Sequence, residues 1–180
     1  MKNEKRDIDL WGQIKKGDVH AYHKLYDRYI NALFTFGMQY TKDEALVQDA
    51  IHDIFVDLHR YRATIASDVV VKSYLFRSLQ NDLFKKLKSQ TKIVRLDVVS
   101  EGAYKIDSAE DELIFSETTL NKNATLALAL SSLTKKQRHA LHLRFSEDLS
   151  YEEISSTLEI SLESCRTLIY RSLKELKAKL

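Results

Sequence analysis

Residues 149–180 read LSYEEISSTLEISLESCRTLIYRSLKELKAKL, and this stretch decides the fold of the C-terminal part of the chain. It contains two apolar segments with polar starts, residues 149–158 and 161–180, which are separated only by Glu159 and Ile160. A connection this short leaves no room for a long loop. The spacing therefore predicts two helices that cross through a tight turn.

Hydroxyl residues mark where the helices of this part of the chain begin. Thr134 is followed by Gln137, and Ser150 is followed by Glu153, at the spacing of the capping box. In that motif the hydroxyl and the later amide or carboxylate bind free backbone amides of the first turn. Ser161 marks a third start, so we expect a compact helical unit here.

The last helix has two contrasting faces. An apolar stripe recurs at steps of three and four residues, and its members are Leu162, Cys165, Ile169, Leu173, Leu176 and Leu180. The residues that we expect to contact DNA are Ser161, Glu163, Ser164, Arg166, Thr167, Tyr170, Arg171 and Lys174. A solvated helix often has a charged face, but the tight turn before it favours a helix-turn-helix. In that motif early residues of the second helix meet base edges, while Lys and Arg contact phosphates.

The charges of the chain are separated into blocks. The sequence has 180 residues, of which 44% are hydrophobic and 30% charged, and its net charge is only +2. This composition suits one sizeable core or two small ones. Residues 43–57 contain acids and no Lys or Arg, residues 72–95 are mainly basic, and residues 97–117 are acidic again. Such segregation predicts separate surfaces for partners of opposite charge.

Helical periodicity also runs through the N-terminal part. Apolar positions recur at three and four residues in 21–40, 41–61 and 69–88, after a shorter amphipathic segment at 8–16. Four glycines and no proline leave few breaks. The segment IVRLDVV at 93–99 has strand propensity, but it lacks a partner strand, and we interpret it as linker.

The expected fold class is therefore all-α. Two small helical domains, residues 1–92 and 121–180, are joined by a flexible acidic linker at residues 93–120, and the C-terminal domain is a helix-turn-helix. Cys165 is the only cysteine, so an internal disulfide is impossible. We find no signal peptide and no run of about eighteen apolar residues, and we expect a soluble cytoplasmic protein without membrane insertion.

Catalytic chemistry is not expected. The histidine pairs His20 with His23 and His139 with His142 lack the cysteine or carboxylate cluster that would complete a zinc site. The sequence has neither a glycine-rich phosphate loop nor a nucleophile elbow. We therefore expect no catalytic residues, no metal, no cofactor and no enzymatic activity.

Three stretches together resemble a known family. Residues 130–176, LSSLTKKQRHALHLRFSEDLSYEEISSTLEISLESCRTLIYRSLKEL, look like region four of bacterial sigma factors of the extracytoplasmic-function (ECF) group, which belongs to the sigma-70 family. Residues 49–62, DAIHDIFVDLHRYR, and 71–88, VKSYLFRSLQNDLFKKLK, resemble two helices of region two of the same family. The resemblance covers most of the chain and keeps the family's order of regions.

The resemblance implies roles for residues of both regions. Residues implied to bind core RNA polymerase, at its beta-prime clamp helices, are Asp49, His52, Asp53, Phe55 and Leu58. Residues implied to melt and hold the minus-ten promoter element are Lys72, Tyr74, Arg77, Asn81, Lys85 and Lys88. Residues 60–68 correspond to a loop that catches a flipped promoter base, and region four is implied to read the minus-thirty-five element and to meet the beta flap.

Several positions depart from the family's pattern, among them His52, Thr134 and Cys165, where glutamine, proline and valine are usual. A glycine is usual in the helix-turn-helix turn where this chain has Glu159, which must then accept a turn conformation that glycine takes more easily. A basic residue is common where this chain has Leu168. That side chain would leave an apolar group near the DNA face.

The leading interpretation is a sigma factor that binds core polymerase and directs promoter-specific initiation, with an anti-sigma factor as a further partner that the family suggests. A second interpretation is a regulator whose N-terminal helices sense or dimerise while the helix-turn-helix binds an operator. A third is a helical interaction protein that binds no DNA. The acidic and basic helices in succession favour the first, because a dimerisation domain has no need of that segregation.

Overall fold

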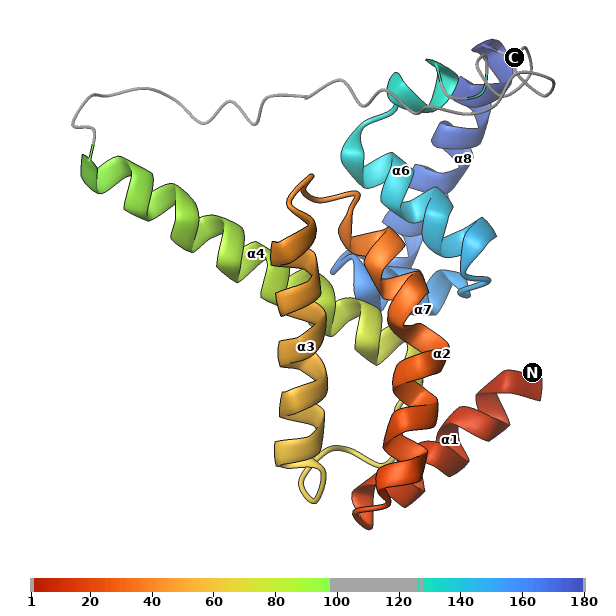
Figure 1. Ribbon diagram of the computed structural model, residues 1–180. Coiled ribbons are helices and arrows are strands. Elements are labelled where there is room, and N and C mark those ends of the chain that lie inside the picture. The colour runs from red at the N-terminus through yellow and green to blue at the C-terminus, as the bar shows by residue number, and fades with distance from the viewer. Residues whose placement is uncertain (1, 98–125, 127, 180) are drawn as a thin grey trace, which may run out of the picture.

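Helices form the framework of the chain in the computed structural model, which describes residues 2–97, 126 and 128–179. Their bounds (Figure 1) are α1 Lys2–Lys15, α2 Val19–Gly37, α3 Glu44–Tyr61, α4 Val71–Asp97, α6 Lys135–Leu141, the π-helix η1 His142–Ser146, α7 Tyr151–Thr157 and α8 Leu162–Lys179. These residues contain no strand, which confirms the all-α fold class. None of the helices just named is both long and apolar enough to cross a bilayer.

The N-terminal unit consists of α1 to α4 packed around a common core. Asp18 caps α2 by accepting hydrogen bonds from the amides of His20 and Ala21 at 2.8 and 3.1 Å, and Asp43 caps α3. The largest fully buried side chains of α1 to α3 are Trp11, Ile14, Leu25, Leu33, Phe36, Ile51, Phe55 and Leu58. The caps fix where the helices begin, and the apolar faces of the helices then meet in one core.

Helices α2 and α3 approach each other closely at Gly37. A Cβ atom at this position would lie 2.5 Å from Cγ1 of Val47, which is itself fully buried. Since a buried valine inside a helix has little freedom to move aside, only glycine fits this crossing.

Helix α4 packs with its first half and projects from the body of the protein with its second half (Figure 1). Its buried side chains include Leu75, Phe76, Leu79 and Leu83. The helix continues to Asp97, so the first residues of the predicted linker, 93–97, are helical instead. Extending an existing helix gains a backbone hydrogen bond per residue, and this outweighs the strand propensity of a segment without a partner strand. Residues 98–120 of that linker lie outside the described residues.

The three helix starts predicted for the C-terminal unit are confirmed. Thr134 and Ser150 both form complete capping boxes, the first with Gln137 and the second with Glu153. The Oγ of Ser161 accepts a hydrogen bond from the amide of Ser164 at 3.1 Å, just before α8. These caps set the short connections that make α7 and α8 cross.

Two non-glycine residues of this unit occupy the left-handed region of backbone space. Asp148 has φ 52°, in the turn before α7, and Glu159 has φ 51°, in the turn between α7 and α8. The expectation that Glu159 would have to adopt a glycine-like turn is thus confirmed. A side chain with a Cβ atom is strained in this conformation, by about 1–2 kcal/mol for most residues and less for Asp.

Replacing Asp148 with Gly is expected to raise the free energy of unfolding by about 0.5 kcal/mol. The glycine relieves strain at positive φ, and this gain is reduced by the greater freedom of glycine in the unfolded chain. The matched control is Asp148→Ala, which keeps the Cβ atom and should be less stable than wild type. Chemical denaturation of the three proteins measures the order, and a glycine variant that ranks below the alanine variant contradicts the strain argument.

Candidate nucleic-acid interface

Helix α8 presents the polar residues that the sequence predicted for DNA. The exposed residues include every one of that set, namely Ser161, Glu163, Ser164, Arg166, Thr167, Tyr170, Arg171 and Lys174. Arg166 lies 3.8 Å from Glu152 of α7 in an exposed ion pair, which contributes little to stability. Arg171 and Lys174 are exposed on the same helix.

The buried stripe of α8 differs from the predicted one at its centre. Ser172 is fully buried, whereas Leu173 is 41% exposed and does not belong to the core stripe. The Oγ of Ser172 donates a hydrogen bond to the carbonyl of Leu168 at 2.7 Å, so the small polar side chain is satisfied inside the core. Leu168, which was expected to lie exposed, is instead half-buried against the core, whereas Leu173 is exposed.

Cys165 lies in this stripe and is fully buried, as expected for a core residue. Burial raises the pKa of its thiol above the ordinary value. A thiol that is buried and protonated is a poor nucleophile, so the side chain contributes packing and not redox chemistry.

The implied polymerase-binding residues of α3 divide into two groups. Asp49, His52 and Asp53 are exposed, and they form the surface that we call the acidic face. Phe55 and Leu58 are fully buried instead, and the ring of Phe55 lies 4.9 Å from that of Tyr26 on α2. These two residues hold the N-terminal core together and offer no surface to a partner.

The acidic face is tied to the basic helix α4 by Lys86. Its Nζ lies 2.6 Å from Oδ2 of Asp53 and 3.6 Å from Oδ2 of Asp82. The hydrogen bond with Asp53 raises the pKa of Lys86, while burial raises the pKa of Asp82. Asp53 is thus already engaged within the protein, and Asp49 is the freer carboxylate for a partner.

The implied promoter-binding residues of α4 also differ in their surroundings. Lys85 and Lys88 are exposed, and Asn81 is half-buried. Tyr74 is 36% exposed, and its ring packs edge-to-face on the ring of Trp11 with the centroids 5.1 Å apart. This leaves part of the Tyr74 ring open to a stacking partner.

Lys72 and Arg77 have acidic partners in the C-terminal unit. Nζ of Lys72 lies 2.8 Å from Oε2 of Glu147, and Nη2 of Arg77 lies 3.1 Å from Oε1 of Glu159. Lys72 also donates a hydrogen bond to the backbone carbonyl of Glu147. Two cations that the sequence assigned to promoter DNA are therefore bound by carboxylates of this same chain.

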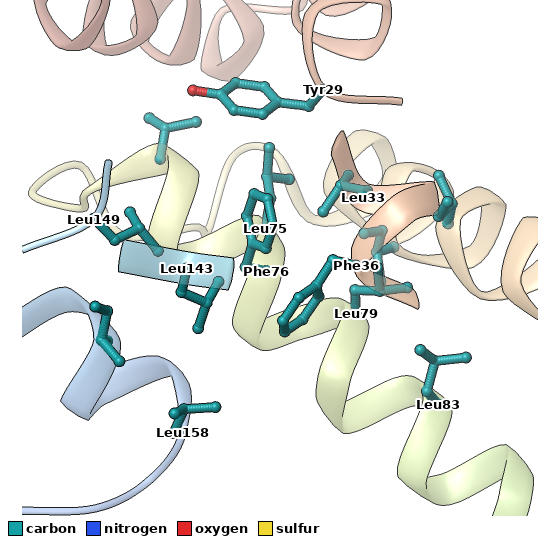
Figure 2. Packing of buried hydrophobic residues seen from close by; sticks show 14 of the residues in the cluster. Tyr29, Leu33, Phe36, Leu75, Phe76, Leu79, Leu83, Leu143, Leu149 and Leu158 are labelled. Carbon is teal, nitrogen blue, oxygen red and sulfur yellow. The ribbon is translucent and has the colours of Figure 1, made fainter. Parts of the chain in front are cut away.

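A wider contact joins α4 to the C-terminal unit. Oγ of Ser73 lies 3.1 Å from Oγ1 of Thr157, and both side chains are buried. Figure 2 shows apolar side chains of both units pointing into one region, with Phe76 of α4, Leu143 of η1 and Phe36 of α2 among them. The hydrophobic core is continuous between the two units.

Two histidines complete this contact. The ring of His139 lies 4.0 Å from that of Tyr40, and its Nε2 is 3.4 Å from the carbonyl oxygen of Gln39. Burial lowers the pKa of His139 to about 4, so the ring is neutral at pH 7. Burial also lowers the pKa of His142, which stacks on Phe36 at 6.0 Å. Sequence reasoning examined these histidines as metal ligands and missed their role in packing.

Sequence comparison places the C-terminal unit in a family described as "Sigma-70, region 4", which matches residues 124–176. The chain is 24% identical to the RNA polymerase sigma-H factor of Pseudomonas aeruginosa, over 96% of this chain and 92% of the relative. It is 25% identical to the ECF RNA polymerase sigma factor SigM of Bacillus subtilis, over 86% and 92%. Identity to the ECF RNA polymerase sigma-E factor of Escherichia coli K12 is also 25%, over 96% and 93%.

Two solved structures share the fold. One is CnrH in complex with the cytosolic domain of CnrY, with a TM-score of 0.65, 20% identity and coverage of 96% of both chains. The other is the sigma factor RpoE in complex with the anti-sigma factor NepR from Bartonella quintana, with a TM-score of 0.65, 18% identity and coverage of 89% of this chain and 96% of that one. At this level of identity the two structures show the fold alone. Residues 124–176 match the sigma-70 region 4 family, and the chain is similar over most of its length to RNA polymerase sigma factors, two of them of the ECF group.

Proposed function

We propose that this chain is a dissociable specificity subunit that binds core RNA polymerase and directs it to promoters with a particular pair of elements. The observation that carries the proposal is the exposed polar face of α8, which lies within the segment that matches region 4. An exposed helix that follows a tight turn, as α8 follows the turn at Glu159, has the arrangement by which a recognition helix enters the major groove of DNA. The proposal assigns α8 to the upstream promoter element.

The acidic face of α3 is proposed to dock on the beta-prime clamp helices of core polymerase, with Asp49 and His52 as contacts and Asp53 beside them. Exposed carboxylates on one helix favour a basic partner surface, both in the rate of encounter and in orientation. The C-terminal unit is proposed to meet the beta flap. An anti-sigma factor is a further proposed partner, because one of the structurally similar proteins was solved with an anti-sigma factor.

Helix α4 is proposed to hold the downstream element through Asn81, Lys85 and Lys88, with Tyr74 stacking on an unpaired base. Lysines along a groove attract the phosphate backbone, and aromatic rings stack on exposed bases. Lys72 and Arg77 join this surface only when Glu147 and Glu159 release them. Promoter binding is therefore proposed to separate the two units of the chain.

The protein itself is proposed to make and break no covalent bonds, since nucleotide addition belongs to the core polymerase. Its place of action is proposed to be the cytoplasm, where a bacterial polymerase meets its promoters. No metal or cofactor is assigned a role in this proposal.

Run-off transcription with purified core polymerase tests this function. The expected result is a discrete transcript from a small set of genomic promoters, formed only when this chain is added. A regulator that acts without core polymerase would instead shift operator DNA alone. That outcome, or the absence of any selective transcript, contradicts the proposal.

Replacing Asp49 with Lys is expected to weaken the binding of core polymerase about fivefold, or by about 1 kcal/mol. The change reverses an exposed charge on the acidic face and leaves the pair of Asp53 with Lys86 in place. The matched control is Asp27→Lys, the same charge change at an exposed site of α2. Competition with unlabelled wild-type protein measures both affinities, and equal losses for the two variants contradict the docking assignment.

A further inference from the structure

The loop between α3 and α4, residues 62–70, is held from the far N-terminal helix. Nε1 of Trp11 donates a hydrogen bond to the carbonyl of Ala66 at 2.9 Å. Nζ of Lys15 donates to the carbonyl of Ile65 at 2.8 Å and to Oγ of Ser67 at 2.5 Å. Side chains one helical turn apart on α1 thus bind three consecutive residues of one loop.

These bonds are placed where the loop has little other support. The loop's own backbone bonds lie near its start, where the amides of Thr64 and Ile65 donate to the carbonyl of Tyr61. Beyond them, residues 66–68 are exposed, and a segment of this kind is mobile unless side chains from elsewhere fix it. A charged donor such as Lys15 gives a stronger hydrogen bond than a neutral one, so α1 supplies the restraint.

Trp11 connects the same loop to α4. Trp11 is 1% exposed, and its ring and that of Tyr74 pack edge-to-face with the centroids 5.1 Å apart. The carbonyl of Ala66 and the ring of Tyr74 therefore share one rigid neighbour. Trp11 thus links the position of the loop to that of the partly exposed Tyr74 ring, while Lys15 binds the loop residues on either side of Ala66.

The contacts also set the hydrogen-bonding character of the loop. The ammonium of Lys15 donates to the hydroxyl oxygen of Ser67, which leaves the hydroxyl hydrogen to donate elsewhere. Thr64 uses its own hydroxyl hydrogen on the carbonyl of Tyr61 at 3.0 Å, which leaves its oxygen to accept. The loop therefore offers an oriented donor at Ser67 and an acceptor at Thr64, two groups that suit the edge of an unpaired base.

We propose that Trp11 and Lys15 are positioning residues for base selection: they fix residues 65–67 beside Tyr74, so that Ser67 donates to an acceptor atom of one unpaired promoter base. This inference rests on the proposed function, because it takes the promoter as the source of that base. It adds α1 to the parts of the chain that determine specificity. Neither Trp11 nor Lys15 needs to touch the DNA.

The test is run-off transcription from a set of promoters in which each position of the downstream element is varied in turn. Lys15→Met keeps the apolar stem and removes the ammonium, and it is expected to reduce discrimination about tenfold at one position. Discrimination at the upstream element should be unchanged. Lys15→Arg restores a charged donor and should recover most of the base preference, and Ser67→Ala should flatten the same position.

Lys16→Ala is the matched control, since this exposed lysine is the next residue along the chain. Trp11→Phe keeps an aromatic ring but removes the N–H donor, and it is expected to reduce the preference for a base at the same promoter position. Thermal unfolding of each variant shows whether it is folded. A uniform fall in transcription from all promoters, with base preference intact in folded variants, overturns the inference.

The wild-type reactions separate this inference from the proposed function. If wild type gives no selective transcript, the proposed function fails and this inference fails with it. If wild type is selective and the Lys15→Met and Trp11→Phe proteins keep its base preference at every position, only the positioning role is overturned.

Discussion

Replacing Phe76 with Ala is expected to lower the free energy of unfolding by about 3–5 kcal/mol, the range for removing a fully buried phenylalanine. Phe76 is fully buried, and its ring lies 5.0 Å from that of Phe36. It belongs to the region where apolar side chains of both units meet (Figure 2). The cavity would therefore weaken the N-terminal core and the contact between the units together. Chemical denaturation measures the loss.

The control for this variant is Phe145→Ala, which removes the same ring from a site that is 61% exposed. An exposed substitution of this kind changes stability by no more than about 0.5 kcal/mol. A shift of similar size in both variants would mean that Phe76 is not part of a continuous core. A faster digestion of the Phe76→Ala protein between its two units would further support their common packing.

Replacing Arg171 or Lys174 with Ala is expected to weaken promoter binding while leaving the fold intact. Both side chains are exposed on α8, away from the buried positions of Cys165 and Ile169. A lost base contact should cost about 1–3 kcal/mol at one promoter position. A lost phosphate contact should weaken binding to every sequence and reduce the salt dependence by about one phosphate. Binding to promoter variants at several salt concentrations distinguishes the two.

The control for these variants is Ile169→Ala. Ile169 is 1% exposed, and its truncation should destabilise the C-terminal unit by about 2–5 kcal/mol through a core cavity. The Arg171 and Lys174 variants should remain within about 0.5 kcal/mol of wild type. Normal transcription by both of them, from a promoter that requires its upstream element, would show that α8 does not face DNA in this way.

Local sequence signals predicted the helices and their starts. The hydroxyl residues Thr134, Ser150 and Ser161 form caps because a cap depends only on residues within one turn of the chain. The strained turn at Glu159 was predicted from the resemblance instead, because the family usually has glycine at that position. The set of polar residues on α8 was also predicted correctly as exposed.

Burial at ambiguous positions was harder to predict. Leu173 and Ser172 both continue a helical spacing of three and four, and the sequence favoured the leucine. The structure buries Ser172, whose hydroxyl is satisfied there by its hydrogen bond to the carbonyl of Leu168 within the helix. In α3, the sequence did not distinguish a core role from a contact role for Phe55 and Leu58. Both are 1% exposed in the structure, and the ring of Phe55 packs against that of Tyr26 on α2.

The contact between the two units could not be predicted from local pattern. It joins residues far apart in the chain, such as Ser73 with Thr157 and Tyr40 with His139. Helical periodicity identifies which face of a helix is apolar, but it does not identify which other helix covers that face. The alternation of acidic and basic blocks did not indicate it either, because Glu147 and Glu159, which bind Lys72 and Arg77, lie outside the two acidic blocks.

In the proposed function, Glu147 and Glu159 occupy the cations that promoter DNA would otherwise bind. Their carboxylates bind Lys72 and Arg77, and because they belong to the same chain, they compete with phosphates at a high effective concentration. Random genomic DNA, which supplies phosphates but not the base contacts of a promoter, is therefore expected to displace them poorly. A promoter that binds together with polymerase supplies many contacts at once. The chain is therefore expected to bind DNA strongly only when both partners are present.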